Sequence, residues 1–224
     1  MLSLILIMKD RRGMELLSPL QRIVKRYRSW ARERYSKMLR RGLTNRDFSI
    51  LSSNCVGGII LHNLGQRFNS PTVNLLMTPD DFVKFLERPK HYLGCELREM
   101  DAGKDYPVGV LDDIRLDFMH YPDFATAEAK WKERSGRIHW DNLYIIMVEA
   151  FGCGRDVIAR FDALPYAHKV CLTEREYPGL ACVYALPDAL RGGGFDCGLT
   201  GYRDRFKIRR WFDDFDYVEF LNQR

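Results

Sequence analysis

Several familiar ligand-binding motifs are missing from this 224-residue sequence. It has no G-x-G-x-x-G fingerprint and no Gly-Lys-Ser or Gly-Lys-Thr, so neither a dinucleotide-binding turn nor a Walker P-loop is predicted. None of its six cysteines forms a C-x-x-C pair, which argues against a zinc ribbon or a thioredoxin-like site. Their irregular spacing, with no secretory signal before them, favours free thiols over disulfides. We predict no metal site and no certain cofactor.

Long hydrophobic runs are also missing. Residues 1–8 are mostly apolar, but a helix that crosses a bilayer needs roughly 20 such residues. Charged residues follow this stretch instead of preceding it, which is the reverse of the order in a signal peptide. We therefore expect a cytoplasmic protein, with any membrane contact peripheral and at the inner face of the membrane.

Acidic residues are scarce at the N-terminus, and this asymmetry divides the chain. Residues 1–45 hold 12 Lys or Arg and 3 Asp or Glu, a net charge of +9, whereas residues 46–224 hold 23 and 27, a net charge of −4. Nucleic-acid binding by residues 46–224 is disfavoured, because phosphates are met by a basic face. We predict an arm over residues 1–45 and an α/β domain over residues 46–224, with a smaller C-terminal subdomain from about residue 150 as a variant of this division.

Residues 15–41 have the periodicity of one amphipathic helix. Steps of three and four place Leu20, Ile23, Tyr27 and Trp30 on one face, while arginines and lysines occupy the other. A basic helix of this kind can lie on an anionic membrane. The alternative is that the apolar face docks on the rest of the protein or on a second copy in a homo-oligomer.

The remaining chain alternates predicted strands with predicted helices, which favours a Rossmann-like, mostly parallel sheet with helices on both faces. The expected strands are residues 48–53, 72–77, 96–100, 108–111, 114–120, 143–148, 169–172 and 181–184. The expected helices are residues 56–66, 78–86, 89–93, 122–134 and 155–163.

The segment with the most promising chemistry is SSNCVGG at residues 52–58, where a buried strand runs into a helix. The carboxyl edge of a parallel sheet is where such folds bind ligands. Cys55 at a helix N-terminus is expected to have a lowered pKa and to be a candidate nucleophile. Ser53, Asn54, Gly57 and Gly58 are candidates for a substrate-binding floor, with free N–H groups that cradle an anion. The plainer interpretation is a buried cysteine beside glycines that allow tight packing.

Two further motifs hold candidate site residues. His120, at the end of a predicted strand, could be a general base near Cys55, with Asp113 orienting it. Arg134 and Arg137 crowd a helix end and could grip a phosphate or carboxylate. The plainer interpretations are a hydrogen-bonded strand-end histidine and surface salt bridges.

On these motifs the chain resembles a bacterial family described as exopolysaccharide biosynthesis proteins, which share a domain of unknown function. The resemblance rests on residues 48–58, 64–72, 81–86, 106–109, 113–114, 120–121, 129–131, 134 and 138–142. It covers residues 46–148 well, the remainder loosely and the arm not at all. Val56 departs from the family pattern, which often has Trp after the Cys.

The resemblance implies an α/β fold and a role in assembling surface polysaccharide, without an established mechanism. Our leading hypothesis is a glycosyl or acyl transferase acting on a glycan or an activated sugar, with a nucleotide-sugar as a possible donor. The first alternative is a cysteine-dependent acyltransferase or hydrolase that uses Cys55 and His120. The second is a glycan-binding or membrane-recruited scaffold without catalysis, because the residues alone do not decide whether a reaction takes place.

Overall fold

A parallel β-sheet forms the centre of the computed structural model, which describes residues 8–9, 15–16, 19–187, 189 and 198–223. Its strand order is β3 (Ser49–Ser52), β7 (Leu143–Val148), β8 (His168–Thr173) and β9 (Val183–Ala185). Every neighbouring pair is parallel, and strands from before and after residue 150 share this one sheet. β7 is buried along its whole length, as expected for an apolar strand that is covered on both faces.

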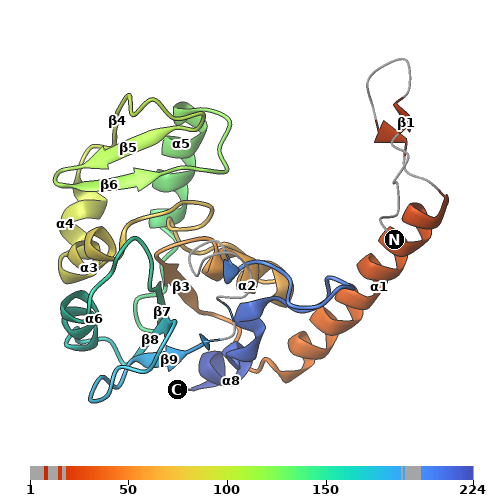
Figure 1. The fold of residues 1–224 in the computed structure, drawn as a ribbon. Helices are drawn as coiled ribbons and strands as arrows, with labels where there is room; N and C mark the ends of the chain where they lie inside the picture. Colours follow the sequence, from red (N-terminus) through yellow and green to blue (C-terminus); the bar gives the residue numbers. More distant parts are fainter. Residues whose placement is uncertain (1–7, 10–14, 17–18, 188, 190–197, 224) are drawn as a thin grey trace.

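Helices cover both faces of this sheet (Figure 1). Successive strand residues point to opposite faces and so enter two separate hydrophobic clusters. One cluster includes α2 (Val56–Leu64) and α8 (Tyr217–Asn222), with Ile50, Ile146 and Leu172 from the strands. The other includes α3 (Pro79–Glu87) and α6 (Arg155–Asp162), with Leu51, Met147 and Cys171 from the strands. The predicted α/β fold is confirmed.

A second, antiparallel sheet stands apart from the mostly parallel sheet that was predicted. It consists of β4 (Arg98–Glu99), β5 (Val108–Leu111) and β6 (Ile114–Asp117), and α4 (Pro89–Gly94) and α5 (Phe124–Ser135) flank it in sequence. β5 and β6 are joined by only two residues, Asp112 and Asp113, whereas a parallel crossover needs a dozen or more. Asp112 takes the left-handed conformation that this tight turn requires, with φ of 53°.

The prediction of a strand over residues 72–77 was wrong. Residues 71–74 form a turn in which Asn74 has φ of 65°, and a single bridge joins Leu76 to Asp117. Val73, Leu75 and Met77 are buried, so the alternation that resembled a strand reflects an irregular segment packed into the core. This segment links the two sheets, because the N–H of Met77 donates to the carbonyl of Ser53 (2.8 Å).

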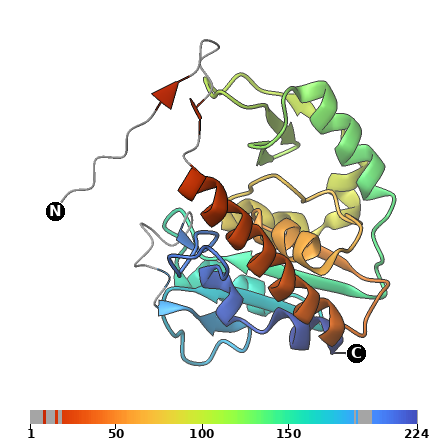
Figure 2. The ribbon, with the colours of Figure 1, turned by 90° about the vertical axis from the view of Figure 1, so that its right-hand side faces the viewer.

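The C-terminal half of the basic helix α1 (Pro19–Gly42) is joined to α2 and α8. Arg40 Nε donates to the carbonyl of Asn63 (2.8 Å), and Asn222 Nδ2 donates to the carbonyl of Gly42 (2.8 Å). The N-terminal half of α1 projects away from the parallel sheet (Figure 1), and the helix crosses the outer side of the molecule (Figure 2). Before it, β1 (Met8–Lys9) pairs antiparallel with β2 (Glu15–Leu16), so the helix begins later than residue 15. Among the described residues, no helix combines the length and the apolar character needed to cross a bilayer.

Candidate functional sites

The turn from β3 into α2 lies at the carboxyl edge of the parallel sheet, as predicted, but its polar groups bind one another. Ser53 Oγ accepts from the N–H of Val148 (3.0 Å) and is buried. Asn54 Oδ1 accepts from the N–H of Val56 (3.0 Å). Ser52 Oγ accepts from the N–H of Gly57 (3.3 Å). Of the N–H groups expected to cradle an anion, that of Gly57 therefore already has a partner inside the turn.

The two glycines of this turn allow close packing. A Cβ on Gly57 would lie 2.7 Å from Ser52 Cβ and 3.0 Å from Ile50 Cγ2, closer than such atoms approach. A Cβ on Gly58 would lie 3.3 Å from Val73 Cγ1. Both glycines are buried, so they set the spacing between α2, β3 and the 71–74 turn. The plainer interpretation of this motif fits these contacts.

Cys55 immediately precedes α2 and is partly buried. Burial raises the pKa of its thiol, which is the opposite of the lowering expected from the helix dipole. Desolvation disfavours the thiolate, and it outweighs the backbone hydrogen bond that lowers the pKa of this thiol. Both Cys55 and His120 are described, and no hydrogen bond joins their side chains. His120 lies exposed in the turn after β6.

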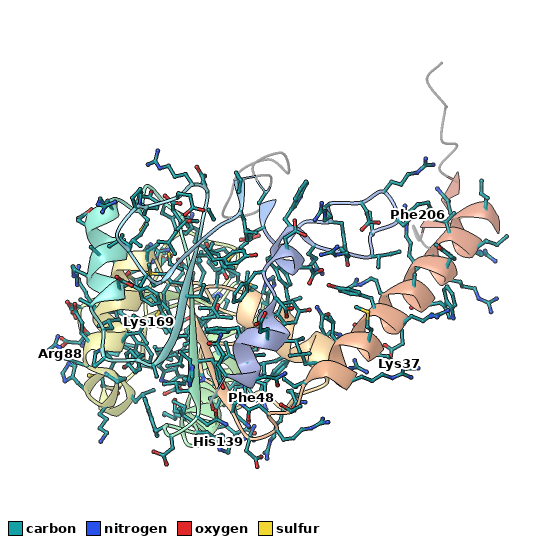
Figure 3. The ribbon with its side chains drawn as sticks, turned by 90° about the horizontal axis from the view of Figure 1, so that it is seen from below. Lys37, Phe48, Arg88, His139, Lys169 and Phe206 are labelled. Carbon is teal, nitrogen blue, oxygen red and sulfur yellow. The ribbon has the colours of Figure 1, made fainter. Side chains whose placement is uncertain are left out.

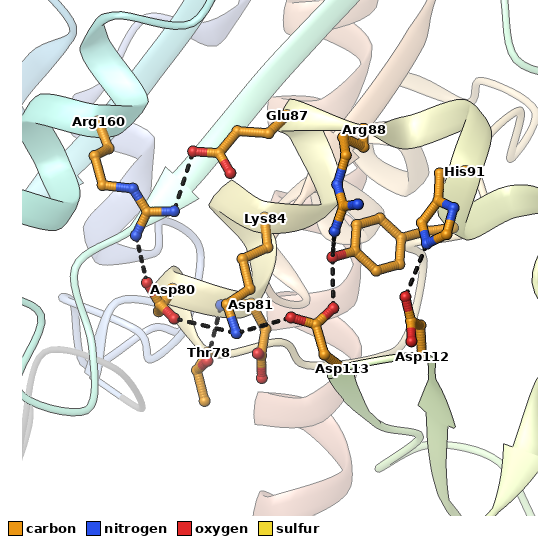
Figure 4. A network of polar contacts seen from close by, with 11 residues as sticks. Thr78, Asp80, Asp81, Lys84, Glu87, Arg88, His91, Asp112, Asp113 and Arg160 are labelled. Atoms are coloured by element: carbon orange, nitrogen blue, oxygen red, sulfur yellow. Dashed lines mark hydrogen bonds and ion pairs between the residues drawn. The ribbon is translucent and has the colours of Figure 1, made fainter.

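Asp113 precedes β6 and His120 follows it, and the four strand residues between them span roughly 13 Å. Asp113 belongs instead to a polar network on α3 and α4 (Figure 4). Tyr92 donates its hydroxyl to Asp113 Oδ1 (2.7 Å), and Lys84 Nζ lies 3.3 Å from Asp113 Oδ2. These two partners hold the pKa of Asp113 below its ordinary value, with the tyrosine the larger cause. The Asp113 carboxylate is therefore bound by Tyr92 and Lys84, and not by His120 or Cys55.

Arg134, in α5, and Arg137, two residues after its end, have different partners. Arg134 Nη1 donates to Tyr121 Oη (2.7 Å), and its guanidinium lies 5.4 Å from the centre of the Phe68 ring. Arg137 pairs with Glu133 and lines a pocket of about 510 Å³. The lining residues of that pocket include Arg46, Phe48, Arg67, Asn69 and His139. Phe48 immediately precedes β3, so this pocket lies at the amino edge of the sheet and Cys55 at the other.

A buried carboxylate at the carboxyl edge was not predicted. Glu149 follows β7 and is 9% exposed. Its Oε2 accepts from the N–H of Glu174 (2.8 Å), and its Oε1 accepts from the Tyr177 hydroxyl. Burial and the Glu149 charge raise the pKa of the Cys153 thiol to about 12, burial being the larger cause. An acid directly after a fully apolar strand was the available signal. Among the described residues, no cluster of three or more His, Cys, Asp or Glu is placed to hold a metal ion.

A hollow lies along α1, and we call it the basic groove. Its volume is about 860 Å³, and α2 and residues 202 and 207 form its other walls. The cations that line it are Lys25, Arg28, Arg32, Arg40 and Lys207. Glu33 is the carboxylate among the lining residues, and it already pairs with Arg40 (3.3 Å). The groove therefore carries a surplus of positive charge.

The Tyr202 ring, which lines the groove, contacts two arginines. The guanidinium carbons of Arg32 and Arg210 lie 5.0 and 4.4 Å from the centre of this ring. Burial lowers the pKa of Arg210, and the charge of Arg32 lowers it further. Among the described residues, the buried side-chain nitrogens without a hydrogen-bond partner are Nε of Arg28 and Nε of Arg210. Unpaired buried donors are uncommon in native proteins, and these two belong to the same cluster of cations.

Such an arrangement can bind an anion. Guanidinium groups hold phosphate and carboxylate through charge-assisted hydrogen bonds, and a ring beside them offers a flat apolar face. His62, on the last turn of α2, also lines the groove, and histidine is a common general base in enzymes. The net charge of +9 over residues 1–45 indicates the arginines of the groove in the sequence. Nothing in the sequence shows that residues 202–210 contact them. Arg28 Nη2 donates to the carbonyl of Arg205 (3.0 Å), across 177 positions of the chain.

Comparison with known proteins places almost the whole chain in one group. Residues 26–222 match the family described as "Domain of unknown function (DUF1919)". An uncharacterized protein of Haemophilus influenzae is 36% identical over 211 residues, which cover 92% of this chain and 99% of that protein. The family match begins inside α1, so the expectation that the resemblance excludes the arm was wrong. It also extends well beyond residue 148, where only a loose resemblance was expected.

Proposed function

The chain belongs to the family of the domain of unknown function DUF1919, and we propose that it holds a phosphate-bearing sugar in the basic groove and transfers it during assembly of a bacterial surface polysaccharide. The surplus of cations in the groove carries this proposal. A volume of about 860 Å³ falls within the usual range for small-ligand sites and suits a sugar nucleotide or a few sugar units. The polysaccharide context rests on the resemblance in sequence.

The groove supplies binding and a means of moving a proton. Arg28 and Arg32 would hold the phosphate oxygens, because paired guanidinium donors match their geometry. His62 would accept a proton from the acceptor hydroxyl group as its oxygen bonds to the anomeric carbon of the sugar. The bond between that carbon and the phosphate oxygen breaks, and the phosphate leaves with the electron pair while Arg28 and Arg32 hold it. The raised pKa of Cys55 does not favour the cysteine-dependent alternative, since attack needs the thiolate.

Binding is tested by calorimetric titration with inorganic diphosphate and UDP-glucose, with maltose as the uncharged comparison. The wild type is expected to bind both anions, and more weakly at high salt, because exposed charges are screened. An Arg28→Gln/Arg32→Gln variant should bind roughly tenfold or more weakly, since each charged hydrogen bond is worth about 1.5–3 kcal/mol. Arg98→Gln/Lys104→Gln makes the same charge change at exposed sites on the second sheet and should bind normally. Equal binding by the groove variant and the wild type would refute the assignment.

The biological role is tested in cells that carry one variant at a time. Polymer yield should fall with Arg28→Gln/Arg32→Gln and not with Arg98→Gln/Lys104→Gln. Full yield from a groove variant that no longer binds anions would refute the role in polysaccharide assembly. His62→Ala separates transfer from binding: we expect normal anion affinity with lost polymer, and normal polymer would point to a scaffold without catalysis.

A further inference from the structure

The outward side of α1 leaves large apolar side chains in water. Ile23, Tyr27 and Trp30 are 64%, 47% and 54% exposed, and their spacing of three and four residues aligns them along one stripe. Leu20, which is 70% exposed, precedes this stripe and also lines the basic groove. Met38, two turns after Trp30, is 57% exposed. The docking of this apolar face on the rest of the protein, one of the two expectations, is therefore only partial: Ala31 is buried and the stripe is not.

A second element extends the stripe. Phe206 is 48% exposed, and its ring meets the Tyr27 ring edge-on, with 6.0 Å between ring centres. Tyr27 in turn lies 5.9 Å from Trp30. Figure 3 shows Phe206 beside the projecting half of α1, away from the parallel sheet. We call the stripe and Phe206 together the outer patch. Two segments far apart in sequence thus build one exposed apolar surface, with aromatic rings at its centre.

Cations surround the outer patch. Helix α1 contains nine Lys or Arg and one Glu. The Arg34 guanidinium lies 5.0 Å from the centre of the Trp30 ring, and the Arg205 guanidinium lies 5.7 Å from that of Phe206. Exposed Arg26, Lys37 and Arg41 lie along the same side of the helix. Aromatic rings with arginines and lysines beside them are the composition of helices that lie in the interface of a bilayer.

The charge decides between a bilayer and a second copy of the chain. In a symmetric dimer through the outer patch, two helices that each carry a net charge of +8 would face each other, and the like charges would repel. An anionic bilayer accepts the apolar side chains and supplies opposite charge at the same depth. We propose that the outer patch seats the protein on an anionic membrane, with α1 parallel to the surface. This proposal is independent of the groove and its ligand.

The test is sedimentation of the full chain with vesicles of phosphatidylcholine alone or mixed with phosphatidylglycerol. Binding to the mixed vesicles, weakened by salt, is expected, with little binding to phosphatidylcholine alone. Ile23→Ser/Trp30→Ser should weaken it roughly tenfold or more, since affinity follows the apolar area buried. Trp140→Ser/Phe151→Ser removes exposed apolar side chains elsewhere, 41% and 57% exposed in the wild type, and should leave binding unchanged.

Other results would overturn the proposal. One is no binding to the mixed vesicles; another is equal binding by the stripe variant when its thermal unfolding matches that of the wild type. A dimer detected by light scattering that Ile23→Ser/Trp30→Ser dissociates, without vesicle binding, would assign the outer patch to a second copy. The groove variant Arg28→Gln/Arg32→Gln retains the whole stripe. If it still binds vesicles while losing diphosphate, the two surfaces are separate.

Discussion

The turn around Cys55 and the basic groove differ in how their polar groups are satisfied. In the turn, three side-chain oxygens accept from three backbone N–H groups within it or on β7. In the groove, cations outnumber carboxylates, and Nε of Arg28 is buried without a hydrogen-bond partner. The turn is complete without a ligand, whereas an anion would complete the groove. The sequence had pointed first to the turn, because a strand that ends in small polar residues resembles a ligand edge.

This contrast predicts that substitutions in the turn impair folding and substitutions in the groove impair binding. The largest effect is expected at Gly57. Gly57→Val forces a side chain against Ser52 and Ile50 and should lower the free energy of unfolding by about 2–3 kcal/mol. Chemical denaturation measures it. The control is Gly94→Ala, where no atom lies within 4 Å of the new Cβ. A Gly57 variant as stable as that control would show that the turn has room for a ligand.

A smaller loss is expected from Ser53→Ala. It removes the acceptor of the Val148 N–H and leaves a buried donor unpaired, which costs about 1–2 kcal/mol. Urea denaturation should show this loss, while diphosphate affinity stays at the wild-type value. Reduced diphosphate affinity in a stably folded Ser53→Ala protein would indicate that the ligand binds at the carboxyl edge of the parallel sheet.

The reactivity of Cys55 gives a third, smaller contrast. Because burial raises the pKa of its thiol, the pH midpoint of its alkylation should lie above that of glutathione. At pH 7.5 the reaction should therefore be slower than that of a free thiol. Iodoacetamide labelling followed by peptide mass spectrometry resolves the site. A midpoint below that of glutathione would revive Cys55 as a nucleophile.

The smallest effect on stability is expected at Arg32. Arg32→Gln removes a contact with the Tyr202 ring but also a charge that repels Arg210, so the free energy of unfolding should change by less than about 0.5 kcal/mol. Thermal unfolding at low salt checks this. A large loss would mean that Arg32 holds the 202–210 segment in place and is not kept for a ligand.

The sequence predicted what local patterns determine. The apolar run of β7 and the Thr78 cap of α3, whose Oγ1 accepts from the N–H of Asp81 (3.2 Å), both stand where expected. The antiparallel sheet was missed because a two-residue turn, not the strand pattern, sets its direction. The sequence also predicts a glycine loop at residues 192–194 and offers Ser18 as an N-cap for the basic helix, but both lie outside the described residues.

The candidate site was harder to predict, because it depends on distant segments. Cys55, Asp113 and Arg137 looked compatible in sequence but lie at the carboxyl edge, in a hairpin turn and at the amino edge. The basic groove joins α1 to Tyr202 and Lys207, which no periodicity connects. Its arginines were read as one face of a helix, and only the fold shows what they face.

The most direct test is a crystal structure of the wild-type protein with inorganic diphosphate bound. We expect its density in the basic groove, within hydrogen-bonding distance of Arg28 and Arg32 and beside Tyr202. Density at the carboxyl edge, between Cys55 and Glu149, with the groove empty, would contradict the central claim and make the turn the binding site.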